Sequence, residues 1–523
     1  MAIEDIIWAK NRHMFGGIEP PHMKTFIARQ RYNEDKQKRV VEIVIELPDD
    51  LTIPKSLVSS GYDASICTIG GVVIRKSETD YPKDENDGEL IANISVDGVP
   101  IEGYIIDENV EPGKTYYYKS FVYSTQGIWR SSLTAEIEML NMTYFFGYDL
   151  DTTNSDPYAR VSYPSDVDNA GYTPAVLNDL KSWNIPAGEK FMPRPCMLTV
   201  EGAVYEYLNP NDYTKTVDGS DSTIADLNLT YNAMMEWPKI YTKRWEENGV
   251  YHFRCSDVKI DKDYECWCNY YGSSEIDHFY TGIYVGTMST TSVNSARLMS
   301  KSGISYSFGQ SANDYRSMAT KNGAGWQVEN ILDHLLIQDL LVMMGHSTNC
   351  QNIFGNGGSK STGTATGKCN SWGLFGSDAS YVKVFGMEDY WGVGRVTSLK
   401  FAQFGWQISL KGTATYCGDL TNRYDYTPDG YIQKMTTYSW GRLPWFNNDF
   451  TDGIYGTATT FECDYIELYT GRTSSVWIGG SVMPEISSYT STTLGPFRYY
   501  AVQYDTHYTN YGCARLACKP VTN

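Results

Sequence analysis

The sequence lacks a long hydrophobic run. Its longest apolar block, residues 331–344, is interrupted by Asp333, His334 and Asp339. The block is also shorter than the ~20 residues that a membrane-spanning helix needs. The first ten residues, MAIEDIIWAK, carry two acidic side chains where a secretory signal has positive charge, and no apolar run follows. We therefore expect no membrane insertion and no secretion, but a protein made in a cytoplasm.

Positive charge is also scarce. The chain has 43 Lys and Arg against 62 Asp and Glu, which gives a formal net charge of −19. A chain this acidic would be repelled by a phosphate backbone, so we expect no nucleic-acid partner. The first 40 residues differ, with eight basic against five acidic side chains. This local surplus suits docking onto an acidic partner, although a solvated surface explains it as well.

Cysteines are too few and too scattered for a disulfide framework. There are 11, an odd number, spread over a chain of 523 residues. The tightest group holds His252, Cys255, Cys266, Cys268 and His278. Its C-x-C spacing is unusual for zinc, which is commonly bound by C-x2-C or wider pairs. The pattern favours buried thiols, and we expect no metal ion.

The common catalytic motifs are missing as well. The glycine-rich residues 355–370 do not match a phosphate-binding loop, because Thr362 stands where its first glycine would be and Cys369 replaces its hydroxyl residue. The sequence has no G-x-S-x-G and no H-E-x-x-H. Neighbours such as His346 and Ser347 do not make a catalytic triad, which is assembled in space. We expect no enzyme, no catalytic residue and no cofactor, while a hydrolase stays open as an alternative.

What the sequence does contain is a composition typical of a folded, multi-domain protein. Hydrophobic residues make up 41%, and a chain of this length divides into two to four domains. Gly-Gly and Pro-Pro near the start indicate an unfolded attachment arm over residues 1–25. Strand signals fill residues 26–140. Residues 141–523 combine long loops, short strands and few helices, which indicates an α+β domain with a β-rich N-terminal extension over about 141–230.

Residues 26–140 resemble a fibronectin type III β-sandwich. The segment Val40–Leu47 alternates apolar and polar residues. After the Pro-Gly turn at 112–113, alternation sends Tyr116, Tyr118, Ser120 and Val122 to one face of a strand. In the fibronectin family such a turn leads to the tyrosine of the tyrosine corner, which here would be Tyr116.

Two helices are expected in the C-terminal part. Residues 325–347 have apolar side chains around most of the circumference, which predicts a buried helix that Gly345 ends. A narrow polar stripe of Asn330, His334 and Gln338 runs along it. A second, short helix is indicated over residues 173–183.

Tyrosine is abundant near the end of the chain. Of 42 tyrosines, six lie between residues 489 and 511, among Ser, Thr, Asn and Gly. Tyrosine gives a recognition surface contact area and a hydroxyl group at low conformational cost. It is equally common in exposed strands, so the composition alone leaves both readings open.

Four short motifs occur in an order that resembles phage tail-fibre and receptor-binding proteins with a C-type-lectin-like domain, including the variable proteins of diversity-generating retroelements. The family pattern is a G-x-E-N-x-W-G element, a Gly-Gly pair, a Gly-x-Phe strand and a final Gly-x-Arg-Leu strand. The matching positions are Gly386, Glu388, Asp389, Trp391, Gly392, Gly479, Gly480, Gly495, Phe497, Gly512, Arg515 and Leu516. The sequence departs from the family at Asp389, where Asn is usual, and at Val482, where Trp is usual. Residues 483–494 are an insertion.

The resemblance implies a virion protein. Residues 1–140 would anchor it to other virion proteins, and the C-terminal domain would bind a glycan or protein of the host surface. The implied location is the particle, after assembly in the host cytoplasm. By analogy with other fibres we expect a homotrimer, although no heptad repeat supports it. The alternatives are a capsid decoration or head fibre, and a polysaccharide depolymerase.

The implied ligand-binding surface is the tyrosine-rich segment. The side chains that we expect to contact the ligand are Tyr489, Tyr499, Tyr500, Tyr504, His507, Tyr508 and Tyr511. The alternative is that these rings line an interface between subunits. The calcium-dependent sugar signatures of true lectins are absent, so the resemblance does not imply calcium.

Overall fold

The computed structural model describes the chain in twelve stretches: residues 19–33, 38–52, 68–358, 360, 364–402, 405–417, 429–445, 452–468, 474–480, 494–501, 505–509 and 512–521. Most of the expected attachment arm, residues 1–18, lies outside them. The chain forms two compact units, 1–142 and 143–523. Strands account for 43% and helices for 7% of the structure, which confirms the expectation of a multi-domain, mainly β protein. No helix in the described stretches has the length and apolar character needed to cross a bilayer.

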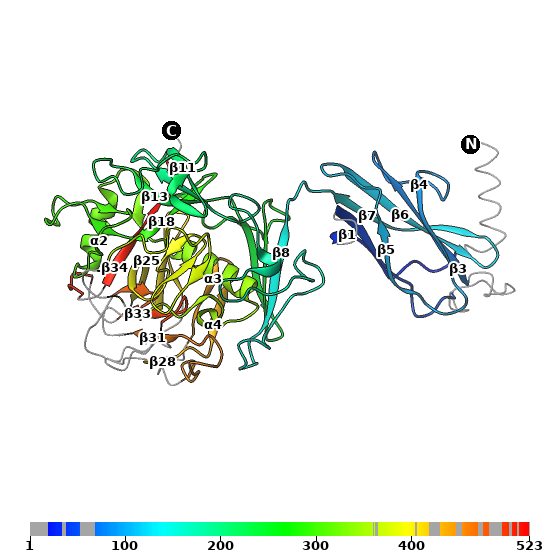
Figure 1. The fold of residues 1–523 in the computed structure, drawn as a ribbon. Coiled ribbons are helices and arrows are strands. Elements are labelled where there is room, and N and C mark those ends of the chain that lie inside the picture. Colours follow the sequence, from blue (N-terminus) through cyan, green and yellow to red (C-terminus); the bar gives the residue numbers. More distant parts are fainter. Residues whose placement is uncertain are drawn as a thin grey trace. The chain divides into compact units, whose positions relative to one another are not determined.

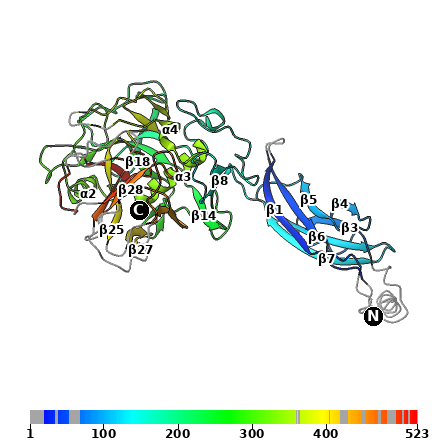
Figure 2. The ribbon, with the colours of Figure 1, turned by 90° about the horizontal axis from the view of Figure 1, so that it is seen from below.

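The N-terminal unit consists of two antiparallel sheets that enclose one apolar core (Figures 1 and 2). The first sheet has the order β1-β2-β5, with β1 at Thr25–Asn33, β2 at Lys38–Glu46 and β5 at Glu102–Asp107. The second has the order β4-β3-β6-β7, with β3 at Ile69–Ser77, β4 at Glu89–Ser95, β6 at Thr115–Ser124 and β7 at Trp129–Glu138.

The predicted alternation in β6 is confirmed. Tyr116, Tyr118, Ser120 and Val122 are all buried on the core face. The hydroxyl of Tyr116 reaches back along the chain, where the Glu111 N–H donates to it at 2.9 Å. This bond fixes the turn that leads into β6 and satisfies a main-chain donor outside the sheet.

A buried ion pair joins the two sheets of this unit. The Lys76 ammonium in β3 lies 2.9 Å from Asp107 Oδ2 at the end of β5, and both side chains are about 3% exposed. Tyr118 donates to the same carboxylate oxygen at 2.7 Å. Lys76 also donates to the main-chain oxygen of Asn109 at 2.8 Å. The buried charges are therefore both paired and hydrogen-bonded, as burial requires.

The C-terminal unit is built around a 14-stranded sheet. Eleven strands follow the order β12-β11-β10-β13-β18-β34-β25-β32-β33-β31-β28, and β21, β26 and β27 attach beside them. Their bounds are β10 Arg194–Leu198, β11 Val204–Asn209, β12 Asp212–Thr216, β13 Asn232–Trp237, β18 Phe279–Val285, β21 Trp326–Val328, β25 Gly394–Ala402, β26 Gly405–Leu410, β27 Thr413–Cys417, β28 Asp429–Tyr431, β31 Tyr465–Leu468, β32 Ser474–Ile478, β33 Tyr499–Ala501 and β34 Gly512–Cys518. The last strand, β34, lies at the centre, between β18 and β25 (Figure 1).

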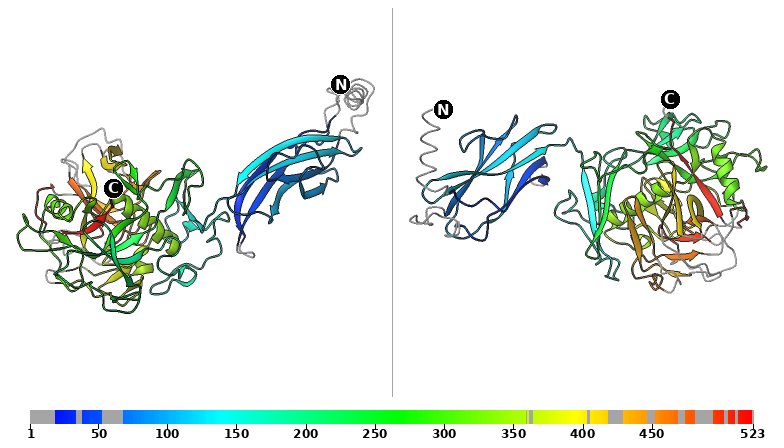
Figure 3. Two further views of the ribbon diagram at one scale, coloured as in Figure 1. Left: turned by 90° about the horizontal axis from the view of Figure 1, so that it is seen from above. Right: turned by 180° about the vertical axis from the view of Figure 1, so that it is seen from behind.

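A smaller sheet forms one side of this unit (Figure 3). Its order is β14-β15-β8-β9, with β8 at Phe145–Asp151, β9 at Val161–Ser162, β14 at Tyr241–Glu247 and β15 at Val250–Ser256. The remaining strands form two-stranded or three-stranded pieces: β16 Tyr270–Tyr271, β17 Ser274–Glu275, β19 Thr287–Met288, β20 Leu298–Met299, β22 Gly376–Ser377, β23 Val382–Val384, β24 Met387–Glu388, β29 Met435–Tyr438 and β30 Gly441–Pro444.

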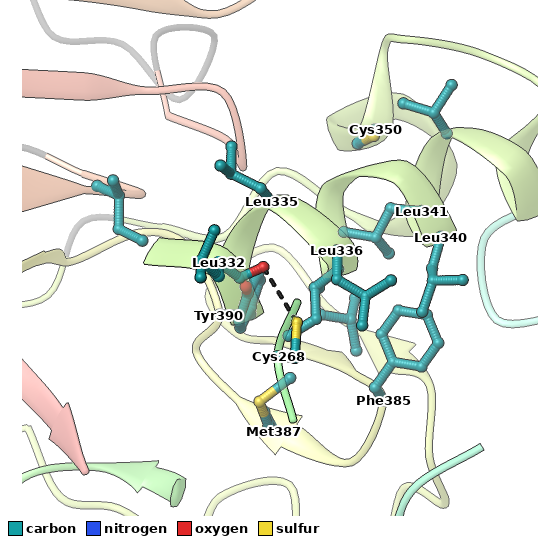
Figure 4. Packing of buried hydrophobic residues seen from close by; sticks show 14 of the residues in the cluster. Cys268, Leu332, Leu335, Leu336, Leu340, Leu341, Cys350, Phe385, Met387 and Tyr390 are labelled. Carbon is teal, nitrogen blue, oxygen red and sulfur yellow. Dashed lines mark hydrogen bonds between the residues drawn. The ribbon is translucent and has the colours of Figure 1, made fainter. Parts of the chain in front are cut away.

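The predicted long helix is present as α3, Ile331–Gly345, and every residue in it is buried. Its leucines pack against side chains from distant strands, and the Cys268 thiol donates to the Leu332 carbonyl at 3.3 Å (Figure 4). Asn330 caps the start by accepting from the Leu332 N–H. At the other end the left-handed residue is His346 (φ 49°), so Gly345 is the last helical residue and not the terminating one.

The polar stripe of α3 binds the chain near the Gly-x-Phe motif. Gln338 and His334 Nε2 both contact the Pro496 carbonyl, at 2.6 and 2.8 Å. Because a carbonyl can only accept, His334 Nε2 carries a proton, and in the neutral ring Nδ1 accepts from the Tyr390 hydroxyl at 2.7 Å. Burial lowers the pKa of His334 to about 4, which keeps the ring neutral.

The prediction of a short helix over residues 173–183 is wrong. Only Lys181–Trp183 forms a helical turn, of the 3-10 type. Asn178 and Lys181 have positive φ angles, and Val176 and Leu177 are more than a third exposed. Ala175 and Trp183 are buried in the core while Val176 and Leu177 face solvent, so the apolar residues pack without helical spacing and the left-handed residues interrupt any helix.

Two helices were not expected. Helix α2, Ala312–Thr320, begins with a capping box in which Ser311 and Asp314 bond each other's main-chain N–H groups. Helix α4, Cys350–Phe354, follows α3 after a short turn. The capping box is a sequence signal that could have located α2.

The buried thiols are confirmed for the ten cysteines that the structure describes, all of which are buried and unbonded to each other. Cys67 lies outside the described residues. Burial raises the pKa of Cys255 and Cys266, so these thiols stay protonated and unreactive at neutral pH. Within the described stretches, no group of three His, Cys, Asp or Glu side chains is placed to hold a metal ion.

Candidate functional site

The tyrosine-rich segment does not form a continuous outer surface. Tyr499 and Tyr500 are completely buried in β33, which lies between β31 and β32. The Tyr499 hydroxyl exchanges hydrogen bonds with the Gln338 amide of α3. The expectation that these two rings contact a ligand is therefore wrong. Tyrosine alternation along a strand cannot reveal that neighbouring elements cover both faces.

His507 and Tyr508 are exposed, and Tyr508 shows 66% of its surface. Tyr489, Tyr504 and Tyr511 lie outside the described residues, so for them ligand contact stays a prediction. Nearby, Asp505 binds Lys400 at 2.8 Å and Arg316 at 3.4 Å. These ion pairs hold the turn at 505–509 on the unit's framework.

The family-like motif residues are structural. Arg515 is buried and donates to four main-chain carbonyls, those of Gly282, Ile283, Glu388 and Asp389. Asp389 adopts φ +51°, a left-handed conformation that Asn and Asp tolerate better than most residues. The Asp at this position is therefore compatible with its backbone conformation. These residues shape the fold and do not face a ligand.

Gly479 and Gly480 lie where two segments of the main chain approach each other closely. Gly479 has φ +80°. A Cβ on Gly480 would lie 2.4 Å from the Val393 carbonyl carbon, which no side chain could tolerate. Glycine is therefore required at both positions to bring this turn against the chain before β25.

The main concave site lies elsewhere in the unit, beside the small sheet. It is a pocket of about 780 Å³ between β14, the β29–β30 hairpin and the segments around Thr152 and Glu462. Its lining residues are Thr152, Thr153, Arg160, Arg244, Trp245, Glu246, Gln433, Lys434, Met435, Thr436, Thr437, Tyr438, Ser439, Arg442, Trp445, Phe461 and Glu462. The volume falls in the range of pockets that enclose small molecules.

Buried charges form one part of the pocket wall. Arg160 and Arg442 each place Nη1 3.3 Å from the same oxygen, Oε1 of Glu462. All three side chains are almost fully buried. Among the residues that the structure describes, Glu462 Oε2 and Arg442 Nε have no hydrogen-bond partner. Burial lowers the pKa of Arg160, with Glu462 acting in the opposite direction.

A second buried cluster supports the third arginine. Arg244 Nε donates to Asp339 Oδ2 at 2.7 Å, and Nη1 donates to the Thr242 hydroxyl. The other oxygen of Asp339 accepts from Tyr148 at 2.7 Å and from Tyr251 at 3.0 Å. Since Asp339 belongs to α3, this network ties the pocket wall to the buried helix.

Aromatic residues from two of the segments that line the pocket complete its wall. Trp245, Tyr438 and Trp445 are each half-buried. Trp245 stacks on His252 with ring centroids 4.6 Å apart, and Tyr438 stacks on Trp440 at 4.5 Å. Trp245 and Tyr438 are therefore each held on one side by another ring of the protein, which fixes their orientation at low entropic cost on binding.

The rim of the pocket is polar and hydrogen-bonded. The Thr437 hydroxyl donates to Glu246 at 2.8 Å, which fastens the hairpin to β14. Lys434 pairs with Asp452 at 2.5 Å, and its ammonium lies 4.8 Å from the Trp445 ring centroid. Gln433, Thr436 and Ser439 supply further polar groups, while the Thr152 and Thr153 hydroxyls donate to the Gly249 carbonyl and to Asp151 and can still accept.

A second hollow, of about 530 Å³, lies near α4. It is lined mostly by short polar side chains, including Asn349, Gln351, Asn352 and Asp378. Gln351 is already engaged, since its amide donates to Asp464 at 2.6 Å. This hollow has no aromatic ring in its lining, so it offers a ligand less contact area than the main pocket.

Sequence reasoning missed the main pocket entirely. Its walls come from four stretches, 152–160, 244–246, 433–445 and 461–462, which are separated by up to about 190 residues. No local pattern brings them together. The pairing of a tryptophan with a basic residue at Arg244 and Trp245 was visible, but many surface strands share that feature.

Comparison with known proteins adds little. No family model and no curated protein matches the chain. Among solved structures, α-L-rhamnosidase from Dictyoglumus thermophilum aligns with 97% of this chain and 47% of its own, at 9% identity and a TM-score of 0.16. The chain thus spans about half the length of that protein, and a similarity this low supports no conclusion about fold or activity.

Proposed function

We propose that the chain is a phage virion attachment protein, a tail fibre or receptor-binding protein. In this proposal residues 1–140 anchor it to other virion proteins, and the C-terminal unit binds a ligand on the host surface. The single observation that carries the binding role is the pocket of aromatic rings, hydroxyls and buried arginines beside the small sheet. Such a combination of contact area and a few fixed polar groups is typical of ligand sites.

The proposed fibronectin type III identity of the N-terminal unit is supported by its strand order. Seven strands form sheets β1-β2-β5 and β4-β3-β6-β7, which corresponds to the A-B-E and D-C-F-G arrangement of that fold. The bond from Glu111 N–H to the Tyr116 hydroxyl is the contact expected of a tyrosine corner. Sandwiches of this kind commonly serve as spacers, which suits an anchoring role.

The proposed C-type-lectin-like identity of the C-terminal unit is supported by its framework. The terminal strand β34 pairs antiparallel with β18 and parallel with β25, with helices α2 and α3 between them in sequence. The motif residues Arg515, Gly479 and Gly480 hold this centre together. The argument from fold to attachment is one of analogy, and the argument for binding stands on the pocket.

A competition experiment tests the proposal. Purified full-length chain is added to host cells before infection, and adsorption of the phage that carries the chain is measured. We expect a dose-dependent fall in adsorption. Unchanged adsorption, with no chain bound to the cells, would contradict the attachment role.

Two further measurements separate the alternatives. Immunogold labelling with an antibody against the chain locates it on particles, and label on the head would identify a head fibre instead. Incubation of the purified chain with host polysaccharide should release no new reducing ends. Their appearance would favour a depolymerase.

A further inference from the structure

We propose that the pocket beside the small sheet binds a saccharide that carries a carboxylate, such as a uronic or sialic acid residue. This inference rests on the proposed function and narrows its ligand. It stands on three features of the pocket: a surplus of buried positive charge, incomplete pairing of that charge, and rings and hydroxyls arranged along the opening.

The first feature is the balance of charge. Three guanidinium groups, those of Arg160, Arg244 and Arg442, line the pocket. Two buried carboxylates face them, because Asp339 pairs with Arg244 and Glu462 serves both other arginines. The pairing leaves one positive charge uncompensated in the wall. This surplus is confined to the buried part of the wall, because the exposed Glu246 also lines the pocket.

The charged groups at the opening do not cancel this surplus. Lys434 is paired with Asp452, so that pair is neutral. Glu246 is exposed and accepts from Thr437. The Asp151 carboxylate, near Arg160, accepts a hydrogen bond from the Thr153 hydroxyl at 2.7 Å. Exposed carboxylates are solvated by water, whereas the buried arginines depend on what lies in the pocket.

The second feature is the pairing geometry. Both arginines approach one oxygen of Glu462 at 3.3 Å, while charge-assisted bonds of this type are usually about 2.7–2.9 Å. The other oxygen of Glu462 and the Nε of Arg442 have no hydrogen-bond partner in the described part of the chain. Unlike Arg244, whose Nε–carboxylate bond is 2.7 Å, these two guanidinium groups are loosely paired. A carboxylate in the pocket would supply the missing counter-charge.

The third feature selects a sugar as the carrier of that carboxylate. Trp245, Tyr438 and Trp445 line the pocket and are half-buried, and aromatic rings of this kind can pack on the C–H faces of a sugar ring. Polar groups of Gln433, Thr436 and Ser439 also line the pocket and match sugar hydroxyls, and the hydroxyls of Thr152, Thr153 and Thr437, which donate within the protein, can still accept from a sugar. An acidic peptide would satisfy the charge but would leave most of these groups unpaired.

Calorimetry or ligand-observed NMR on the full-length chain tests the proposal. The probes are short oligosaccharides of glucuronate, galacturonate and mannuronate, sialyllactose, their neutral counterparts, inorganic phosphate and a glutamate-rich peptide. We expect at least one sugar acid to bind ten-fold or more tightly than its neutral counterpart, and more weakly as salt rises. Phosphate and the peptide should bind at least ten-fold more weakly than that sugar acid.

Variants tie the binding to the pocket. Glu462→Gln removes a carboxylate and leaves the shape nearly unchanged, so it should tighten acid binding and leave neutral sugars unaffected. Trp245→Ala and Tyr438→Ala alter half-buried rings and should weaken binding ten-fold or more. Tyr205→Ala, an exposed ring distant in sequence from every pocket segment, is the matched control and should bind as the wild type does.

The outcomes separate this inference from the proposed function. Equal binding of acidic and neutral sugars, tighter binding of phosphate or peptide, or no binding of any sugar acid would each overturn the inference. If the full-length chain still blocks phage adsorption in such a case, the attachment role stands and another ligand class is recognised. If it does not block adsorption although a sugar acid binds, the attachment role fails alone.

Discussion

Arg442 Nη1 and Glu462 Oε1 lie 3.3 Å apart in an almost fully buried contact between strand β30 and the segment before β31. Arg160 approaches the same oxygen at the same distance from the other side. On its other face, the Arg442 guanidinium lies 4.5 Å from the Tyr251 ring centroid. One carboxylate thus holds together three stretches of chain that build the pocket wall.

Removing that carboxylate should destabilise the C-terminal unit. In Glu462→Ala two buried guanidinium groups lose their shared partner, and breaking a buried pair in this way typically costs about 3–5 kcal/mol. Lys434→Ala is the control, because the Lys434–Asp452 pair is nearly half exposed and should contribute less than about 1 kcal/mol. Urea unfolding followed by tryptophan fluorescence measures both, and equal losses would contradict the buried role.

The buried carboxyl of Asp464 should make the stability of the C-terminal unit depend on pH. Burial raises the pKa of its carboxyl from 3.8 to about 7, against the opposing hydrogen bonds from Gln351 and from the Phe497 N–H. An acid whose pKa is raised on folding binds more protons in the native state. The contribution of Asp464 to the free energy of unfolding is therefore greatest below pH 4 and is lost as the pH rises to about 7.

Replacing Asp464 by Asn keeps the shape and removes the titration. Relative to wild type, Asp464→Asn should gain stability by about 1.4 kcal/mol per pH unit between pH 4 and 7. The difference should be constant above pH 7. Urea unfolding at a series of pH values checks this, and a difference that does not change with pH would contradict the assignment. Asp378→Asn, an exposed carboxyl of the second hollow, serves as control.

The tyrosine corner of the N-terminal unit gives a local prediction. Tyr116→Phe removes the acceptor for the Glu111 N–H and should cost about 1 kcal/mol. Hydrogen exchange of the Glu111 amide should become faster, while exchange in the C-terminal unit stays the same. Tyr117→Phe, on the opposite face of β6, should change neither quantity.

The buried pair between Lys76 and Asp107 should also be visible in stability. Asp107→Ala leaves the ammonium with Glu89 and the Asn109 carbonyl as its remaining partners, and we expect a loss of about 3–5 kcal/mol. In wild type the pKa of Lys76 is raised; burial opposes this, but Asp107 and Glu89 outweigh it. The stabilisation from this ion pair is therefore fully present below pH 10.5 and lost above it. Unfolding of wild type and of Lys76→Met at alkaline pH measures this loss.

Much of the framework could be predicted from sequence because it rests on local periodicity. The alternation around Tyr116 and the apolar circumference of residues 331–345 each fix an element and its burial. The prediction of a short helix over residues 173–183 failed because Asn178 and Lys181 adopt positive φ angles, which a right-handed helix cannot contain, although Ala175 and Trp183 are buried.

The site could not be predicted, because it depends on which distant segments meet. Tyr499 and Tyr508 look alike in sequence, yet one is sealed behind α3 and the other is open to solvent. The pocket needs Arg160, Arg244 and Arg442 to converge, and their partner carboxylates come from still other elements. Only the tertiary arrangement shows that three arginines share two carboxylates.

Substitutions of the buried Tyr499 and the exposed Tyr508 should differ in their effect on stability. Tyr499→Phe should lower the free energy of unfolding by about 1 kcal/mol, since the buried Gln338 amide loses a partner. Tyr508→Ala should change it by less than about 0.5 kcal/mol, as is usual for exposed positions. If Tyr508→Ala instead abolishes cell binding, the exposed turn at 505–509 contributes to the ligand surface beside the pocket.

The central claim is that the pocket beside the small sheet is where the host surface is recognised. The most direct measurement is the binding isotherm of fluorescently labelled full-length chain on host cells, for wild type, Trp245→Ala, Tyr438→Ala and the control Tyr205→Ala. The account predicts at least ten-fold weaker binding for the two pocket variants and wild-type binding for the control. Pocket variants that fold normally and bind cells as tightly as wild type would contradict it.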